Sequence, residues 1–318
     1  MPGTMSLASL GGFETRLRPR TPSSVALRLC RPASRMPLAA KAATDGASAA
    51  AHPSPELPKP QGTLKTLKHQ VPEEADMPGL LHNDPKSGFS VFLKKRTKTI
   101  YFIRHAEGIH NEAAREAGTD NVLVGDMKFW DSPLNTTGVD QCIKFRRDVI
   151  EKEKMQAELV VVSPMTRTLQ TAMFCMGPLH GTPSPIQRPD GSMPPFVALE
   201  MCRERFGKYT CDGRRHISKI SPDFPAVDFS MVKDDGDLLW GEERESDEDC
   251  ATRAIEFLEW LFDRPECCIV VVTHSSFMRH MFAHNWSVLG TAGNDREELT
   301  RSAGNCEMRT VVLCKHSM

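Results

Sequence analysis

The sequence lacks any apolar run near the length of a membrane-spanning helix, which needs about 20 consecutive residues. It also lacks a surplus of one charge, since 40 basic side chains and 41 acidic ones leave a net charge of −1. The lack of a long apolar run gives no reason to expect a membrane partner, and the balanced charge gives no reason to expect a nucleic-acid partner. Apolar residues make up 40% of the chain and charged residues 25%, as in an ordinary globular protein.

The sequence also lacks the cysteine spacings that are typical of disulfide frameworks and CxxC motifs. The chain has 10 cysteines but no CxxC pair, and their spacing does not indicate a disulfide framework. Most lie in helix-like or strand-like patterns, which indicates small buried apolar groups in a reducing compartment. His280 and His284 are spaced i, i+4, but no glutamate follows His280 and no third ligand is evident in the sequence, so helix packing or the surface is favoured. We therefore predict no metal and no cofactor.

Acidic residues are scarce at the N-terminus. Through residue 44 the only acid is Glu14, against six arginines and Lys41, with Ser, Thr, Ala and Pro between them. This composition predicts an organelle transit peptide, and the alternative is a disordered extension that carries no targeting signal. Residues 45–75 are rich in Ala and Pro and are interpreted as a linker. The expected organisation is a transit peptide and linker over 1–75 and one domain over 88–318.

Within that domain, strand-like and helix-like patterns alternate. Apolar, β-branched runs predict strands, and amphipathic stretches predict helices. The predicted strands are 99–104, 158–162, 197–199, 267–272 and 310–313, and the predicted helices are 138–154, one opening at Ser163-Pro164, one opening at Ser246, and 276–286. Residues 205–245 show little periodicity and read as an insertion. The alternation predicts an α/β fold, a three-layer α/β/α sandwich with a mainly parallel sheet.

Charged and polar side chains follow three of these strands. Arg104-His105 stands at the end of the first, and His274 follows the strand 267–272. Ser163 follows the strand 158–162, and Arg167 comes four residues later. Parallel sheets bind ligands at the carboxyl ends of their strands, so these residues are expected to meet at one mouth.

These residue types suit phosphoryl transfer. Arg104 and Arg167 can each present a planar fork to phosphate oxygens. His105 can act as a nucleophile when its other ring nitrogen donates to a fixed acceptor. His274 is expected to be its cationic partner, which hydrogen-bonds the transferred group.

Three sequence blocks carry a family resemblance. They are Arg104-His105, the segment from Ser163-Pro164 through Arg167 to Gln170-Thr171-Ala172, and Thr273-His274-Ser275. Together they resemble the histidine phosphatase superfamily over about residues 97–315, so the implied fold is phosphoglycerate mutase-like. Further blocks, among them His110-Asn111 and Asn305-Cys306-Glu307-Met308-Arg309, resemble plant and algal phosphoglycerate mutase-like proteins.

The resemblance implies roles for individual residues. His105 would be the phosphorylated residue, and Arg104, Arg167, His274 and Asn111 would bind the phosphate. It also implies an acidic proton donor. Glu204 matches the family's Glu-Arg-x-x-Gly pattern better than Glu200 does. Glu107 is a third candidate, although a solvated loop acid is the simpler interpretation of it.

The function that follows is a phosphomonoesterase acting on a small phosphorylated metabolite. One alternative is phosphoglycerate mutase-type transfer, but Ala106 replaces the family's usual glycine and the mutase pattern around the acid is only partly kept. The other is a non-catalytic phosphate-binding or interaction module on the same fold. Arg214 and Arg215 in the insertion could form a lid. The likeness to plant proteins favours the chloroplast, with the mitochondrion or the cytoplasm as alternatives, and the sequence does not specify the oligomeric state.

Overall fold

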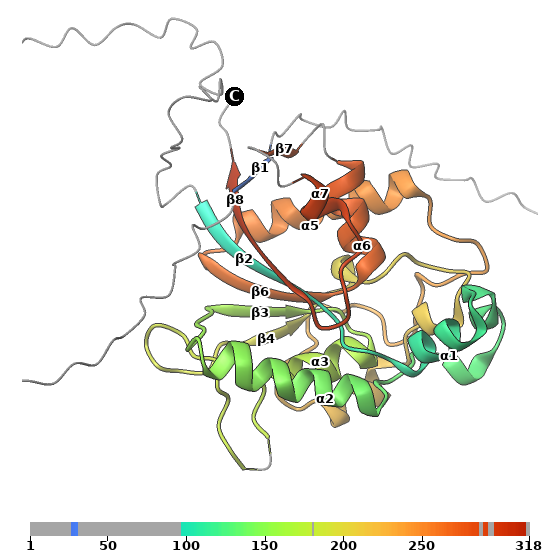
Figure 1. Ribbon diagram of the computed structural model, residues 1–318, viewed down its shortest axis with the longest axis horizontal. Coiled ribbons are helices and arrows are strands. Elements are labelled where there is room, and N and C mark those ends of the chain that lie inside the picture. The colour runs from blue at the N-terminus through green and yellow to red at the C-terminus, as the bar shows by residue number, and fades with distance from the viewer. Residues whose placement is uncertain (1–26, 31–96, 180, 286–288, 292–295, 316–318) are drawn as a thin grey trace, which may run out of the picture. The chain divides into compact units, whose positions relative to one another are not determined.

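The computed structural model describes residues 27–30, 97–179, 181–285, 289–291 and 296–315 (Figure 1). Its strands are β1 Leu27–Cys30, β2 Thr97–Arg104, β3 Leu159–Val162, β4 Phe196–Ala198, β5 Val227–Asp228, β6 Cys268–Thr273, β7 Leu289–Thr291 and β8 Met308–Lys315. Its α-helices are α1 Ile109–Ala117, α2 Thr136–Phe145, α3 Thr166–Met176, α4 Ile217–Ile220, α5 Asp247–Asp263, α6 Ser275–Arg279 and α7 Arg296–Thr300. The π-helical turns Arg146–Glu151 and His280–His284 extend α2 and α6. Short 3₁₀ helices span Asp120–Leu123, Met127–Phe129, Glu200–Cys202, Thr210–Asp212 and Ser221–Asp223.

The described strands form one sheet in the order β5-β4-β3-β6-β2-β8-β1-β7. The run from β5 to β2 is parallel throughout. Only β8 is antiparallel to its neighbours β2 and β1, among the strands that the structure describes. The predicted mainly parallel sheet is confirmed.

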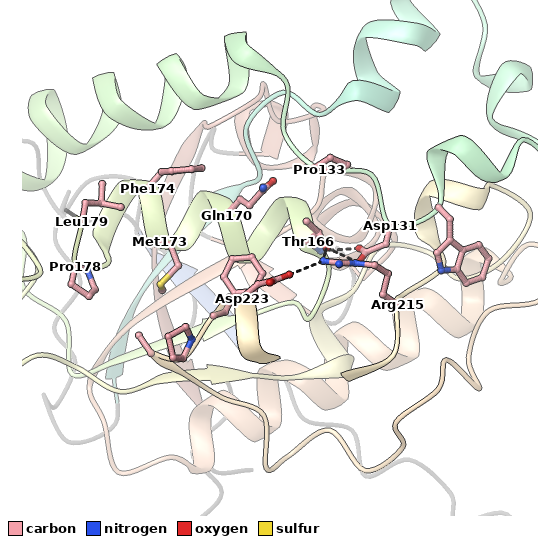
Figure 2. A pocket seen from close by; sticks show the side chains of 14 residues that line it. Asp131, Pro133, Thr166, Gln170, Met173, Phe174, Pro178, Leu179, Arg215 and Asp223 are labelled. Atoms are coloured by element: carbon pink, nitrogen blue, oxygen red, sulfur yellow. Dashed lines mark hydrogen bonds and ion pairs between the residues drawn. The ribbon is translucent and has the colours of Figure 1, made fainter. Parts of the chain in front are cut away.

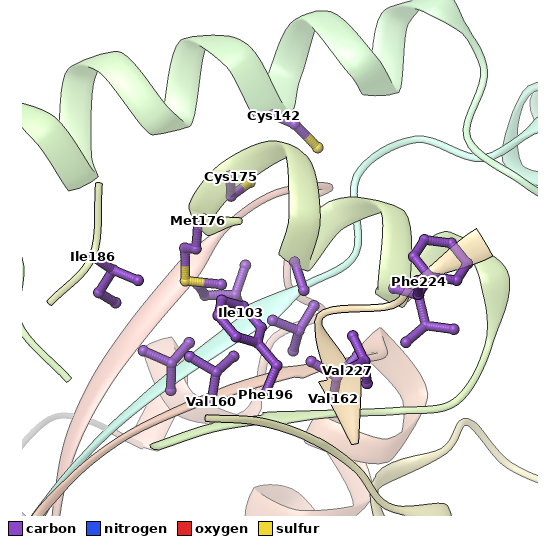
Figure 3. Close-up of a cluster of buried hydrophobic side chains, with 14 of the residues drawn as sticks. Ile103, Cys142, Val160, Val162, Cys175, Met176, Ile186, Phe196, Phe224 and Val227 are labelled. Atoms are coloured by element: carbon purple, nitrogen blue, oxygen red, sulfur yellow. The ribbon is translucent and has the colours of Figure 1, made fainter. Parts of the chain in front are cut away.

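Helices cover both faces of this sheet, as the side-chain alternation of β3 shows. All four residues of β3 are buried. Leu159 and Val161 pack into one apolar cluster with α5, whereas Val160 and Val162 pack into another with α2 and α3. Figure 1 shows α5, α6 and α7 on one side of the sheet and α2 and α3 on the other, and Figure 3 shows the second cluster from close by. The predicted α/β/α sandwich is therefore confirmed.

One helix begins later than the sequence predicted. We expected Ser163 to cap it and Pro164 to stand in its first turn, but α3 begins at Thr166. The backbone N–H of Thr166 donates to Asp131 Oδ1 at 2.8 Å, so a distant aspartate satisfies this helix end. Ser163 does not cap this helix, and its side chain instead contacts His274 at the site described below.

The predicted N-terminal extension lies mostly outside the described residues. Within it, only Leu27–Cys30 is described, and these four residues pair with β8 and β7 as β1. That segment falls within the predicted transit peptide, and the transit peptide, the linker and the domain boundaries stay predictions. None of the described helices is long and apolar enough to cross a bilayer.

Candidate active site

The strand register brings the two histidines together. Arg104 at the end of β2 pairs with Thr273 at the end of β6, so His105 and His274 leave the sheet side by side. Their ring centroids lie 5.2 Å apart. Ser163 follows β3, the other neighbour of β6, and its Oγ lies 2.8 Å from His274 Nε2. The expected meeting of these side chains at the carboxyl edge is present.

A cavity of about 460 Å³ opens at this edge. The strand ends, α1, the 204–212 segment and the start of α6 all contribute to its wall. Of the residues predicted for the site, Arg104, His105, Asn111, Arg167 and Glu204 line it. His274 lies behind this wall, fully buried.

The backbone fixes the ring of His105. Its Nδ1 lies 2.7 Å from the carbonyl oxygen of Ala106, and because a carbonyl only accepts, Nδ1 carries the proton. Nε2 therefore keeps its lone pair, which is the tautomer that a nucleophile needs. Burial lowers the pKa of His105 well below 6.5, and the guanidinium groups of Arg167 and Arg104 lower it further. The neutral ring is available without a general base.

Two arginines have a buried, unused donor atom in the wall that holds this ring. Arg104 donates from Nη1 to the carbonyl oxygen of Ala303, and Arg167 donates to Cys211 and Asp212. The Nε atom of each guanidinium is buried with no hydrogen-bond partner. A buried N–H without an acceptor is costly, so two of them in one cavity wall indicate a site for an anion.

His274 differs from the expectation in its charge. Burial lowers its pKa well below 6.5, and Arg167 and His105 lower it further. In the protein alone, the neutral ring is favoured over the predicted cation. Its Nδ1 is buried without a partner, like the two arginine Nε atoms.

A third imidazole, from His110 on α1, completes the cluster. Its ring centroid lies 5.6 Å from that of His105, and its Nδ1 is a further buried atom without a partner. Sequence reasoning quoted His110 in the resemblance but gave it no role. Its position five residues after His105 was the only available signal.

The structure separates the three candidate acids. Glu204 lines the cavity, and its carboxylate accepts hydrogen bonds from the backbone N–H groups of Ser276 and Phe277 at 3.1 and 2.8 Å. Glu200 is instead bound by two buried arginines, Arg203 and Arg214. Neither Glu200 nor Glu107 lines the cavity, so position favours Glu204.

Glu107 holds the first loop together. Its carboxylate pairs with Arg115 at 2.6 Å and accepts a hydrogen bond from Asn135 at 2.8 Å. The bond from Arg115 is the largest effect that lowers the pKa of Glu107. This acid is a link between α1 and the cap of α2, not a group at the cavity.

The expected lid of Arg214 and Arg215 is wrong. Arg214 is 2% exposed, and its guanidinium donates to Glu200 and to four backbone carbonyls. Arg215 lines a second cavity of about 710 Å³, where it contacts Asp131 and Thr166 (Figure 2). The cations that line the first cavity besides Arg104 and Arg167 are Arg205, Lys208, Arg244 and Arg279.

Asp212 and Arg244 are site residues that sequence reasoning missed. Asp212 is buried between two guanidinium groups, at 2.9 Å from Arg167 and 2.6 Å from Arg244. It holds Arg167 in place against the cavity wall. Both residues belong to the aperiodic insertion, where no pattern could indicate an ion pair 32 positions apart.

The buried imidazoles predict that stability falls in mild acid. The pKa values of His105, His110 and His274 are all lowered, so the folded protein takes up fewer protons than the unfolded chain below about pH 6.5. We expect the free energy of unfolding to decrease by up to about 4 kcal/mol per pH unit below pH 6.5. Urea unfolding between about pH 7.5 and 5 measures it. A flat profile would contradict buried neutral rings.

Comparison with known proteins fits this geometry. Residues 100–295 match the model of the histidine phosphatase superfamily, branch 1. A phosphoglycerate mutase-like protein of Arabidopsis thaliana is 34% identical over 248 residues, which cover 71% of this chain and 88% of that protein. Phosphoglycerate mutase-like protein 1 of the same plant is 35% identical over 254 residues, covering 73% and 86%.

Solved structures were also compared. That of a mycobacterial glucosyl-3-phosphoglycerate phosphatase is 19% identical and covers 68% of this chain and 91% of its own, with a TM-score of 0.39. The family assignment rests on the sequence matches, which span the strands and helices that build the cavity. The chain belongs to branch 1 of the histidine phosphatase superfamily.

Proposed function

We propose that this protein is a phosphomonoesterase that acts on a small phosphorylated metabolite through a phosphohistidine at His105. The observation that carries the proposal is the pair of unpartnered Nε atoms of Arg104 and Arg167 in the wall that also holds His105. A phosphoryl group supplies acceptors for both and stands within the same cavity as the nucleophilic nitrogen.

The first step transfers the phosphoryl group to the protein. The lone pair of His105 Nε2 attacks phosphorus, and the bond from phosphorus to the leaving oxygen breaks. Glu204, entering in its protonated form, gives its proton to that oxygen so that an alcohol leaves. Arg104 and Arg167 neutralise the charge on the three remaining oxygens. A dianionic phosphate opposes the effect of the arginines on His274 and favours its protonated form.

The second step returns the enzyme to its starting state. A water molecule attacks phosphorus, the bond to Nε2 breaks, and the carboxylate of Glu204 accepts the proton of the water. Orthophosphate leaves, and His105 regains its neutral ring with the proton on Nδ1, where the carbonyl oxygen of Ala106 accepts it. His274 gives up its proton to solvent as the charge of the phosphate leaves, so no charge or proton is left over.

The remaining wall favours a substrate with a second anionic group. Arg205, Lys208, Arg244 and Arg279 add four cations around the cavity. Asp212 and Asp120 are the acids there besides Glu204, among the described residues. A volume of about 460 Å³ suits a small metabolite.

A trapping experiment tests the covalent step. The protein is mixed briefly with a radiolabelled aryl phosphate, quenched in alkali and digested. We expect label that is stable to base and labile to acid on the peptide carrying His105. Steady phosphate release without any labelled histidine would reject the proposal. Incubation with 3-phosphoglycerate then separates the activities, because a mutase forms the 2-isomer and a phosphatase releases orthophosphate.

A further inference from the structure

Three cysteines that are far apart in the sequence form one cluster behind the active site. Cys142 belongs to α2, Cys175 to α3, and Cys306 precedes β8. Their sulfur atoms are buried and all lie within 4.8 Å of one another, with 3.9 Å between Cys175 and Cys306. Figure 3 shows Cys142 and Cys175 where α2 and α3 face each other, beside the apolar cluster.

These distances lie close to those of a metal-ligand set. Three sulfurs that each lie ~2.3 Å from a central ion stand roughly 4.0 Å apart. The observed spacing needs a contraction of less than about 1 Å to reach this arrangement. A disulfide would instead require two of the sulfurs to approach to about 2.05 Å. The resting geometry is closer to shared coordination than to an oxidised pair.

The coordination number separates the candidate ions. No fourth Cys, His, Asp or Glu joins the group within the described part of the chain. Structural zinc takes four protein ligands in a tetrahedron, which this cluster does not offer. Soft thiolate sulfur suits Cu⁺, zinc and iron–sulfur clusters, and of these the d¹⁰ monovalent Cu⁺ is the ion that accepts three ligands.

Hydrogen bonds from the thiols of Cys142 and Cys175 lower the pKa of Cys306 to about 5, so Cys306 is a thiolate at neutral pH. The pKa values of Cys142 and Cys175 are raised, which keeps them as thiols. The ligand that binds a metal is the thiolate and not the thiol, so loading this site displaces the thiol protons.

We propose that Cys142, Cys175 and Cys306 form a three-coordinate site for Cu⁺. The site touches the nucleophile through the backbone. The N–H of Cys306 and the amide of Asn305 both donate to the carbonyl oxygen of His105 at 3.2 Å. A bound ion links α2, α3 and the segment that carries Asn305 and Cys306. It therefore stabilises the fold and also the segment whose N–H groups bind the carbonyl oxygen of His105.

Anaerobic titration of the reduced full-length protein tests the site. Cu⁺ is supplied from a coloured Cu⁺ chelator, and transfer to the protein is followed by loss of the chelator's absorbance. We expect one equivalent to be bound, and Cys306→Ser to weaken binding at least about tenfold. The matched control replaces Cys267 and Cys268, which are consecutive in the sequence, with serine. It should bind Cu⁺ like the wild type, since both lie outside the cluster.

Two results would overturn the proposal. One is equal affinity of the wild type and Cys306→Ser, with the circular dichroism spectrum showing both folded. The other is X-ray absorption at the copper edge of the loaded wild type that finds fewer than three sulfur neighbours. Neither measurement uses phosphatase activity, so failure here leaves the proposed function untouched.

Discussion

His105→Ala lowers kcat/KM for phosphomonoester hydrolysis by about 10⁴-fold or more, if the covalent route operates. The variant removes the nitrogen that attacks phosphorus while Arg104 and Arg167 keep their bonds to the protein. Phosphate binding should therefore survive the loss of turnover. Initial rates with an aryl phosphate, together with orthophosphate affinity from calorimetry, measure both effects.

The matched control for this variant is His284→Ala. His284 is exposed at the end of the π-helical turn His280–His284 and lies outside the cavity lining, so its replacement should leave the rate unchanged. Retention of more than about one hundredth of the activity in His105→Ala would show that another group attacks phosphorus. His110→Asn would then be the next variant to examine, because its ring is 5.6 Å away.

Glu204→Gln removes proton donation and keeps one of the two bonds to the start of α6. Ser276 and Phe277 donate to different oxygens of the carboxylate, so the single amide oxygen can accept from only one of these N–H groups, and the amide cannot give up a proton as an acid. With an alkyl phosphate, whose leaving oxygen needs that proton, we expect the rate to fall by about 10²–10⁴-fold. With p-nitrophenyl phosphate the leaving group departs as an anion, so the fold-loss of rate should be smaller than that with the alkyl phosphate, by a factor of several to about ten.

Glu200→Gln is the control for the choice between the two acids. Because Glu200 pairs with Arg203 and Arg214, its amide variant should lower the unfolding temperature and leave the ratio of alkyl to aryl rates unchanged. A ratio that shifts in Glu200→Gln and stays constant in Glu204→Gln would reverse the assignment. An equal loss with both substrates in Glu204→Gln would make it a positioning residue for α6.

The strands β2, β3, β4, β6 and β8 could be predicted from the sequence, because burial on both faces leaves an apolar run, whereas β1, β5, β7 and the order of the sheet could not. Val160, Val161 and Val162 are such a run, and the polar residue after it marks the sheet edge. Arg104 pairs with Thr273 because β2 and β6 run parallel and both strands end at this position. Thus the dipeptide Arg104-His105 already located the cavity.

Other parts of the site depend on chain paths that no local pattern encodes. The helix start at Thr166 depends on Asp131, 35 residues earlier, which enters with a positive φ of 48°. Arg214 and Arg215 are adjacent in sequence, yet one is held among carbonyls and the other reaches a second cavity. The thiol cluster likewise joins residues 131 positions apart, which spacing rules for CxxC motifs cannot detect.

The position of β2 between β6 and β8 has a consequence for synthesis. A ribosome releases β2 before either of the strands that flank it, since β6 begins at Cys268 and β8 at Met308. The guanidinium of Arg104 also waits for its acceptor, the carbonyl oxygen of Ala303, 199 residues downstream. A nascent chain therefore cannot build the wall that holds Arg104 and His105 until these downstream segments have been synthesised.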